Sequence, residues 1–272
     1  MSAPPEAGTA DKRTRAGAGR LDAWLACHRA AREQGIAAGL AELCRTFGPD
    51  VLPCGPSGHA LVPASVARAA RRVWYDGVLS DRAAGRDTML TPALASDEGL
   101  VALCHSQGWL VQPGRKGRPA PRGRQATRSS LAAVAPADWR IGLTWLRLGL
   151  SERLAGACLA YLGSRDVDGG TLLGQQLVQA GLADALIAHA EVTAVLAPRS
   201  PANASPTEIG WLHNRLTRAD RDLVRLLGGS GFVSAEPGRC ALVSELLADI
   251  YLGGDRQAAG EGNGEGNGHD RA

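Results

Sequence analysis

Two polar side chains, Arg165 and Gln176, stand on either side of a turn that interrupts a helical pattern. They are eleven positions apart, and residues 166–170 between them break helices, so both side chains could reach one ligand. A guanidinium and an amide suit a pyrophosphate, one by charge and the other by hydrogen bonding. Further along, Gly228 and Gly229 would let a ligand approach the backbone closely. A plainer interpretation remains open: Arg165 is a surface charge favoured by a helix C-terminus, and Gln176 is a surface amide.

A second concentration of charge lies in the segment 114–128. Six basic residues occur there without an acid: Arg115, Lys116, Arg118, Arg122, Arg124 and Arg128. Such a run could hold phosphates, but no aromatic residue is interleaved to stack on bases. The whole chain carries a net charge of only +3. We therefore interpret this segment as a solvated basic loop and do not expect a nucleic-acid partner.

The six cysteines are scattered, with no CxxC pair and no histidine at metal spacing. The sequence therefore predicts no metal site, and reduced thiols are typical of a cytoplasmic protein. The N-terminus has no apolar segment of the kind found in secretion signals, and no apolar run is long enough to span a bilayer. We expect a cytoplasmic chain without a membrane partner.

The segment 139–254 is predicted to supply the scaffold. Its apolar residues follow helical spacing over about 139–164, 172–196, 206–227 and 239–251. The third of these helices has the clearest start, because Ser205 and Glu208 form a capping box around Pro206. Helices of this length with short connections predict an antiparallel four-helix bundle.

The rest of the chain divides by composition and periodicity. Residues 1–20 and 255–272 lack large apolar side chains almost entirely and are predicted to be a disordered arm and a disordered tail. Residues 21–87 are predicted to be an N-terminal helical region, and 88–138 a short middle segment of strand and loop that contains the basic loop. The predicted fold class is mainly α.

An ordered set of residues across the bundle resembles one known family, the acyl-CoA dehydrogenases. The resemblance covers about 115 residues and matches that family's C-terminal helical domain. It is carried by Gly149-Leu150, Leu159-Ala160-Tyr161, Arg165, Gly169, Gln176, Leu182-Ala183-Asp184, Gly228-Gly229-Ser230-Gly231-Phe232 and Ile250-Tyr251. The resemblance implies N-terminal helices, a middle β-domain, bound FAD and an acyl thioester substrate.

The resemblance also assigns roles to residues. It places Arg165, Gln176, Gly228 and Gly229 at the FAD of a neighbouring subunit, which implies a homo- or hetero-oligomer. Arg140 matches an arginine that the family has near its substrate. Only about fifty residues separate the N-terminal helices from the bundle, so the middle β-domain is shortened.

Several positions depart from the family pattern. Asp168 stands where a flavin-stacking Phe is usual, and Arg225 stands where a Gln is common. The family's general base commonly follows the Ile-Tyr pair, but Leu252 occupies that position and cannot accept a proton. A minority of the family carries its base at the position of Trp139. Asp138, one residue away, is therefore the candidate catalytic base.

Two functional hypotheses follow. In the first, the chain is an FAD-dependent flavoprotein that oxidises a CH–CH bond of an acyl thioester, with Asp138 or a partner subunit as the source of the base. In the second, it is a non-catalytic acyl-CoA dehydrogenase-like subunit or pseudoenzyme that completes a partner's FAD site. The second accounts for Leu252, Asp168 and the short middle segment.

Overall fold

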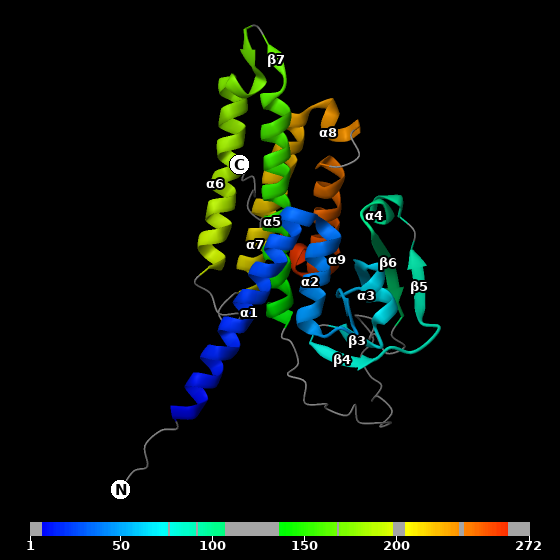
Figure 1. Ribbon diagram of the computed structural model, residues 1–272. Helices are drawn as coiled ribbons and strands as arrows, with labels where there is room; N and C mark the ends of the chain where they lie inside the picture. Colours follow the sequence, from blue (N-terminus) through cyan, green and yellow to red (C-terminus); the bar gives the residue numbers. More distant parts are fainter. Residues whose placement is uncertain are drawn as a thin grey trace, which may run out of the picture.

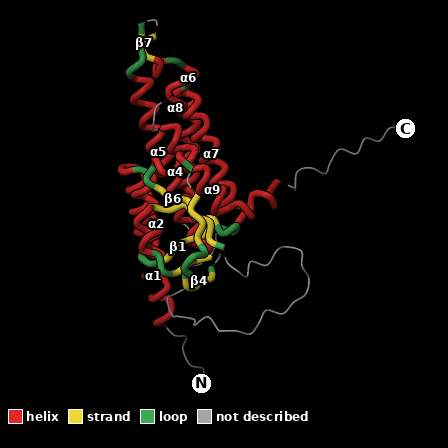
Figure 2. Tube along the Cα trace, turned by 90° about the vertical axis from the view of Figure 1, so that its right-hand side faces the viewer, coloured by secondary structure: helices red, strands yellow, loops and turns green. Residues whose placement is uncertain are grey.

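The structure is a computed structural model that describes residues 7–75, 77–90, 92–106, 136–167, 169–197, 205–233 and 237–260. Long helices stand side by side, and the short strands gather next to α2 and α9, away from the β7 end (Figure 1). Viewed from the side, β1, β4 and β6 lie together in one half of the molecule, while β7 lies at the opposite end (Figure 2). The mainly helical fold predicted from the sequence is therefore confirmed.

Four long helices form the C-terminal half: α5 (Pro136–Gly163), α6 (Gln176–Leu196), α7 (Pro206–Leu227) and α9 (Pro237–Gly260). They pack against one another and alternate in direction along the chain. A small hairpin of β7 (Asp166–Val167) and β8 (Gly170–Thr171), followed by the 3-10 turn η1 (Leu172–Gly174), joins α5 to α6. The short helix α8 (Gly229–Val233) lies between α7 and α9.

Where the sequence contains a strong capping signal, the observed end of the helix agrees with the predicted one. The Ser205 hydroxyl accepts a hydrogen bond from the Glu208 backbone at 3.2 Å, and Pro206 is the first residue of α7. In contrast, α9 continues to Gly260, so the prediction of a disordered tail is wrong for residues 255–260. Glycine inside a helix costs only about 1 kcal/mol, and the glycines at 253 and 254 do not end this one.

Two N-terminal helices, α1 (Ala7–Gln34) and α2 (Ile36–Phe47), pack against each other and against α5. Small residues allow the close approach: a Cβ added to Gly142 would lie 2.4 Å from Leu43, and one added to Gly149 would lie 2.4 Å from the His28 carbonyl oxygen. Because α1 begins at Ala7, the predicted disordered arm is wrong for residues 7–20. Alanine, lysine and arginine have high helix propensity and extend the helix beyond its apolar part.

Short strands follow α2. The first sheet has the order β1 (Val51–Cys54), β3 (Arg72–Tyr75), β4 (Val78–Asp81), and the second has the order β2 (His59–Pro63), β6 (Leu100–His105), β5 (Asp87–Leu90). Among the strands that the structure describes, only β1 and β3 pair in parallel. Two short helices, α3 (Ala64–Ala69) and α4 (Ala93–Asp97), connect strands. The prediction that residues 21–87 are helical is therefore wrong for β1 to β5 but holds for α3, because short apolar runs do not distinguish buried strands from helices. The basic loop lies outside the described residues.

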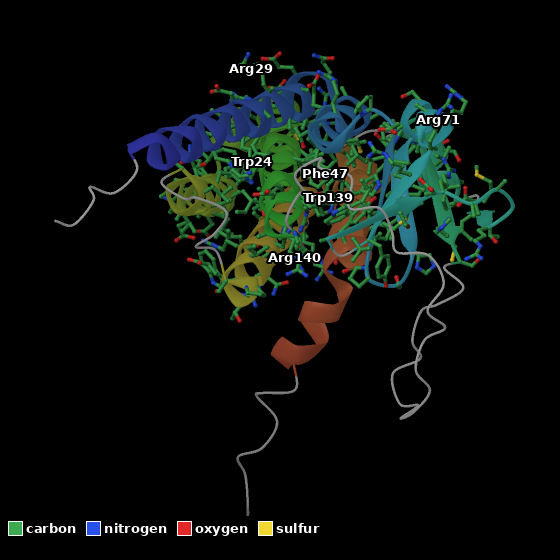
Figure 3. The ribbon with its side chains drawn as sticks, turned by 90° about the horizontal axis from the view of Figure 1, so that it is seen from below. Trp24, Arg29, Phe47, Arg71, Trp139 and Arg140 are labelled. Atoms are coloured by element: carbon green, nitrogen blue, oxygen red, sulfur yellow. The ribbon has the colours of Figure 1, made fainter. Side chains whose placement is uncertain are left out.

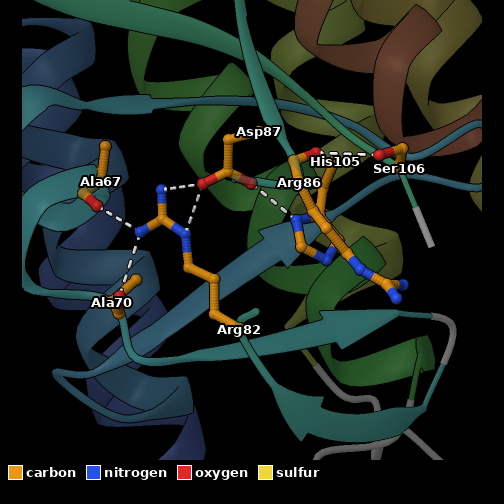
Figure 4. Close-up of polar contacts among 7 residues, drawn as sticks. All are labelled: Ala67, Ala70, Arg82, Arg86, Asp87, His105 and Ser106. Carbon is orange, nitrogen blue, oxygen red and sulfur yellow. Dashed lines mark hydrogen bonds and ion pairs between the residues drawn. The ribbon is translucent and has the colours of Figure 1, made fainter. Parts of the chain in front are cut away.

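One polar cluster fixes the second sheet against α3 (Figure 4). Arg82 donates to the backbone oxygens of Ala67 and Ala70 and pairs with Asp87. The other Asp87 oxygen lies 2.6 Å from Nδ1 of His105, which is buried. Burial acts to raise the pKa of Asp87, but the bonds from His105 and Arg82 outweigh it and hold the pKa below its usual range. We interpret this cluster as structural, because its hydrogen bonds join β5 to β6 through Asp87 and His105 and reach α3 through Arg82.

The helices and sheets share one hydrophobic core that runs from Trp24 to Leu252. A second, smaller core lies at the β7 end of the bundle, between α5, α6 and α7. No helix among the described residues has the length and apolarity to cross a membrane.

Candidate functional site

Tyr161, Arg165 and Ser230 meet at the β7 end of the bundle. The Arg165 guanidinium lies over the Tyr161 ring, 4.8 Å from its centroid. The Ser230 hydroxyl donates to the Tyr161 hydroxyl at 2.6 Å. These contacts bring the end of α5 to α8, and with it Gly228 and Gly229. We call Tyr161, Arg165, Gln176, Gly228, Gly229 and Ser230 the Arg165 corner.

Gln176 joins this corner through the folded connection between α5 and α6. The Leu172 amide donates to the Arg165 carbonyl at 2.8 Å, and the Gln175 amide donates to the Leu172 carbonyl at 3.1 Å. Gln176 is then the first residue of α6, and both it and Arg165 are exposed. Asp168, the departure from the family pattern, lies outside the described residues.

The corner is a cationic, solvent-facing surface. The Ser230 hydrogen bond and the nearby Arg165 lower the pKa of Tyr161, against a smaller opposing effect of burial. Gly228 ends α7 with φ of 54°, a conformation that favours glycine. A guanidinium, two hydroxyls and exposed backbone can together bind a phosphate-bearing group. The residues of the corner thus fit the pyrophosphate part of FAD.

The candidate base lies at the opposite end of α5. Asp138 is in the first turn of that helix, is 3% exposed and pairs with Arg20 of α1. The Asp138 carboxylate is thus engaged with a guanidinium of its own chain and is not presented to a substrate. This partner was not predicted, because Arg20 falls in the segment predicted to be disordered.

Aromatic rings fill the core beside Asp138. The Trp139 ring lies 4.9 Å from Phe47, 4.9 Å from Tyr251 and 6.1 Å from Trp74, measured between centroids. Figure 3 shows Trp139 beside Phe47 in the interior at this end. The Tyr251 hydroxyl is fixed in turn, because it bonds both the amide and the carbonyl of Leu61 at 3.1 Å.

The described residues leave little space for a ligand around Trp139. The cavity that Arg140 lines together with Trp74, Trp139 and Tyr251 has a volume of about 10 Å³. A cavity needs roughly 10–15 Å³ to hold one water molecule, so this space does not fit a flavin ring or an acyl chain. Leu252, at the usual position of the base, is 2% exposed and belongs to the same core.

The two sets of predicted residues are therefore not brought together within one chain. Asp138 and Gly163 are separated by 25 residues of α5, which at 1.5 Å per residue is about 37 Å. Asp138, Arg140 and Leu252 lie at one end, and the Arg165 corner lies at the other. One flavin could contact both only if they came from different subunits.

A buried polar network crosses the bundle between these ends, and the sequence analysis missed it. Arg147 is fully buried and donates to Ser244 at 3.0 Å, to Thr217 at 2.8 Å and to the His213 carbonyl at 3.3 Å. Thr144 bonds the His213 ring at 2.9 Å. An arginine among Leu143, Leu146 and Leu150 was the available signal.

Asp220 and His189 extend this network along the bundle. The Ser151 hydroxyl and His189 Nε2 are hydrogen-bonded at 2.7 Å, and His189 is buried, so it is a core histidine. Burial raises the pKa of Asp220 to about 6, although Arg147 and a hydrogen bond from Ser151 act to lower it. No cluster of His, Cys, Asp and Glu among the described residues could hold a metal ion.

Comparison with known proteins gives structural similarity only. No protein-family model matches the chain, and no curated protein matches it. The ChsE4–ChsE5 complex from Mycobacterium tuberculosis aligns with a TM-score of 0.57 at 16% identity, over 92% of this chain and 81% of that one. Glutaryl-CoA dehydrogenase from Mycobacterium smegmatis aligns with a TM-score of 0.55 at 15% identity, over 93% and 82%.

A third similar structure is the Tcur3481–Tcur3483 steroid ACAD (acyl-CoA dehydrogenase) G363A variant, with a TM-score of 0.51 at 16% identity. The alignment covers 79% of this chain, which spans 62% of the length of that one. The chain has an acyl-CoA dehydrogenase-like fold.

Proposed function

We propose that this chain is a non-catalytic acyl-CoA dehydrogenase-like subunit that completes the FAD site of a partner subunit. The observation that carries the proposal is the contrast between the two ends of α5. The Arg165 corner is exposed and suits a phosphate-bearing group, whereas the end with Asp138 and Leu252 is closed by aromatic rings.

The corner supports a role toward a neighbour's cofactor. The exposed guanidinium of Arg165 would pair with the FAD pyrophosphate, and Gln176 would donate an amide hydrogen bond. The contact of Arg165 with Tyr161, and the bond from Ser230, hold this cation beside Gly228 and Gly229. The chemistry that the flavin would supply in the partner's active site is hydride acceptance. This chain would help to bind and orient the flavin there.

The other end of α5 argues against catalysis by this chain. Removing the α-proton of a thioester needs a positioned base, and Leu252 cannot serve. Asp138 is buried and paired with Arg20, so a role in fixing α1 against α5 suits it better than proton abstraction. Arg140 faces a cavity with room for about one water molecule and not for an acyl thioester.

The partner that this function requires is an acyl-CoA dehydrogenase-type subunit in a hetero-oligomer. The similar ChsE4–ChsE5 structure is a complex. A chain that contributes only the Arg165 corner needs such a partner, because the rest of the flavin site and the base must come from elsewhere. The acyl thioester would bind to the partner.

The test begins with the full chain expressed alone and titrated with FAD. We expect no shift of the flavin absorption bands and no flavin retained after gel filtration. Retained flavin, with bands perturbed as in a protein site, would contradict the proposal.

The second step uses the tagged chain isolated from its source cells. We expect a complex that contains a longer dehydrogenase-type subunit and bound FAD. Arg165→Ala should leave the complex intact but lower its FAD content, whereas Arg218→Ala, an exposed arginine on α7 outside the corner, should not. Equal FAD content in the two variants would remove Arg165 from the site.

A further inference from the structure

A second cavity lies between α4, α7, α8 and α9 and has a volume of about 460 Å³. This is within the range of small-molecule sites in proteins, roughly 300–1,000 Å³. Its described lining consists of Leu94, Thr217, Asp220, Arg221, Val224, Arg225, Gly231, Gly238, Arg239, Ala241, Leu242 and Glu245. We call this space the α7–α9 cavity.

Cations surround this cavity, and each is held by an exchangeable ion pair. Arg221 pairs with Glu245, Arg225 pairs with Asp222, and Arg239 reaches from α9 to Asp97 at 3.2 Å. The Arg225 side chain is 72% exposed, and solvent-exposed pairs of this kind contribute only about 0–1 kcal/mol. A ligand carboxylate can therefore take the free donors of Arg225 and Arg239 at little cost.

The wall between these cations is apolar. Leu94, Val224 and Ala241 line it, and Leu242 is 56% exposed there. A large aliphatic side chain left in water at the mouth of a cavity favours an apolar ligand body, because its burial removes that surface from water.

The inner wall is polar. Thr217 and Asp220 line the cavity and are only 5% and 3% exposed. The Asp220 Oδ1 atom is buried and has no hydrogen-bond partner among the described residues. Buried acceptors are nearly always satisfied, so this atom indicates that a hydrogen-bond donor belongs here.

We propose that the α7–α9 cavity binds a small carboxylic acid that carries a hydroxyl group at the far end of an apolar chain. The carboxylate pairs with Arg225 and Arg239, the chain lies on Val224 and Leu242, and the hydroxyl donates to Asp220. Asp220 and Arg225 are five residues apart on α7, or about 7.5 Å along its axis. With the added reach of the arginine side chain, a linear chain of eight carbons is a suitable probe.

The test compares three probes of equal length with the full chain: 8-hydroxyoctanoate, octanoate without the donor, and 1,8-octanediol without the anion. Ligand-observed NMR titration gives each dissociation constant. We expect 8-hydroxyoctanoate to bind at least fivefold more tightly than either of the others. Equal binding of octanoate would overturn the role of Asp220, and equal binding of the diol would overturn the role of the arginines.

Variants locate the binding. Arg225→Gln combined with Arg239→Gln should weaken 8-hydroxyoctanoate at least tenfold, and Leu242→Asp should do the same through the apolar wall. Arg218→Gln is the matched control on α7, since Arg218 is exposed and does not line the cavity. Circular dichroism confirms that each variant is folded. Binding that survives both cavity changes, or that is lost equally in the control, would place the ligand elsewhere and refute the proposal.

Discussion

Replacing Asp220 with Asn tests the energetics of the buried network directly. Asp220 is 3% exposed, and burial raises the pKa of its carboxyl from 3.8 to about 6. Arg147 from α5 lowers this pKa, and Glu245 from α9 raises it. Asparagine has the same shape as the protonated acid but carries no charge at any pH. The substitution therefore removes the cost of keeping a charged carboxylate in the interior.

The magnitude follows from linkage. A difference of about two pKa units, at about 1.36 kcal/mol each, amounts to about 3 kcal/mol. Because the folded pKa is raised, the group's stabilising effect is fully present below the unfolded pKa near 3.8 and is lost as pH rises through 6. Asp220→Asn should thus match the wild type near pH 4 and be more stable by up to about 3 kcal/mol at pH 7.5.

The assay is urea unfolding of both proteins at intervals from pH 4 to 8. The pKa of the His189 ring is lowered by burial, against the effect of Glu152, and this group acts in the opposite direction over part of the range. Its contribution is common to both proteins and cancels in their difference. A difference that is constant with pH, or a variant less stable at pH 7.5 than at pH 4 relative to wild type, would refute the reasoning.

Three further substitutions test other parts of the structure. Trp139→Ala should destabilise the chain by about 3–5 kcal/mol, because the ring is 1% exposed and contacts Phe47, Trp74 and Tyr251. A loss below about 1 kcal/mol in denaturant unfolding would mean that this cluster is loosely packed. Asp87→Asn should lower the free energy of unfolding by about 2 kcal/mol at pH 7. Because the pKa of Asp87 is lowered in the folded protein, this difference from wild type should vanish as pH falls below about 4. Leu252→Glu should lower the melting temperature and yield no dehydrogenase activity with added FAD. Leu252→Met is the conservative control. An active, folded Leu252→Glu variant would show that this end still accepts flavin and substrate.

The bundle was predictable because its signals are local. The Ser205 capping box and the spacing of Ile209, Leu212 and Leu216 specify a helix whatever lies around them. The strands were not predictable, because Val51–Cys54 and His59–Pro63 are short apolar runs whose pairing partners lie far along the chain. β2 pairs with β6 across roughly forty residues, and no local pattern encodes that register.

The candidate site was predictable only in part, for the same reason. Within the Arg165 corner, only Arg165 and Gln176 flank a single turn, so only their proximity could be predicted from spacing. Ser230 comes from a segment 69 positions from Tyr161 and was not predicted. The pairing of Asp138 with Arg20 joins residues 118 positions apart, and the Arg147 network joins three helices. Contacts of this kind depend on how helices cross, which the sequence pattern does not specify.

The burial of Leu252 and the small volume of the cavity lined by Trp139 and Tyr251 have a common physical basis. A carboxylate at position 252 would need water or a ligand beside it, because burying an unpaired charge costs far more than burying a leucine. Here Trp139, Phe47 and Tyr251 occupy that space and form part of the core that joins the bundle to the N-terminal helices and the sheets. These rings are among the side chains through which the two halves pack. Catalysis and stability therefore compete for the same volume at this end, and the structure uses that volume for the core. The Arg165 corner is free of this conflict because it lies about 37 Å away on the surface, where a ligand-binding role can be kept without any cost to the fold.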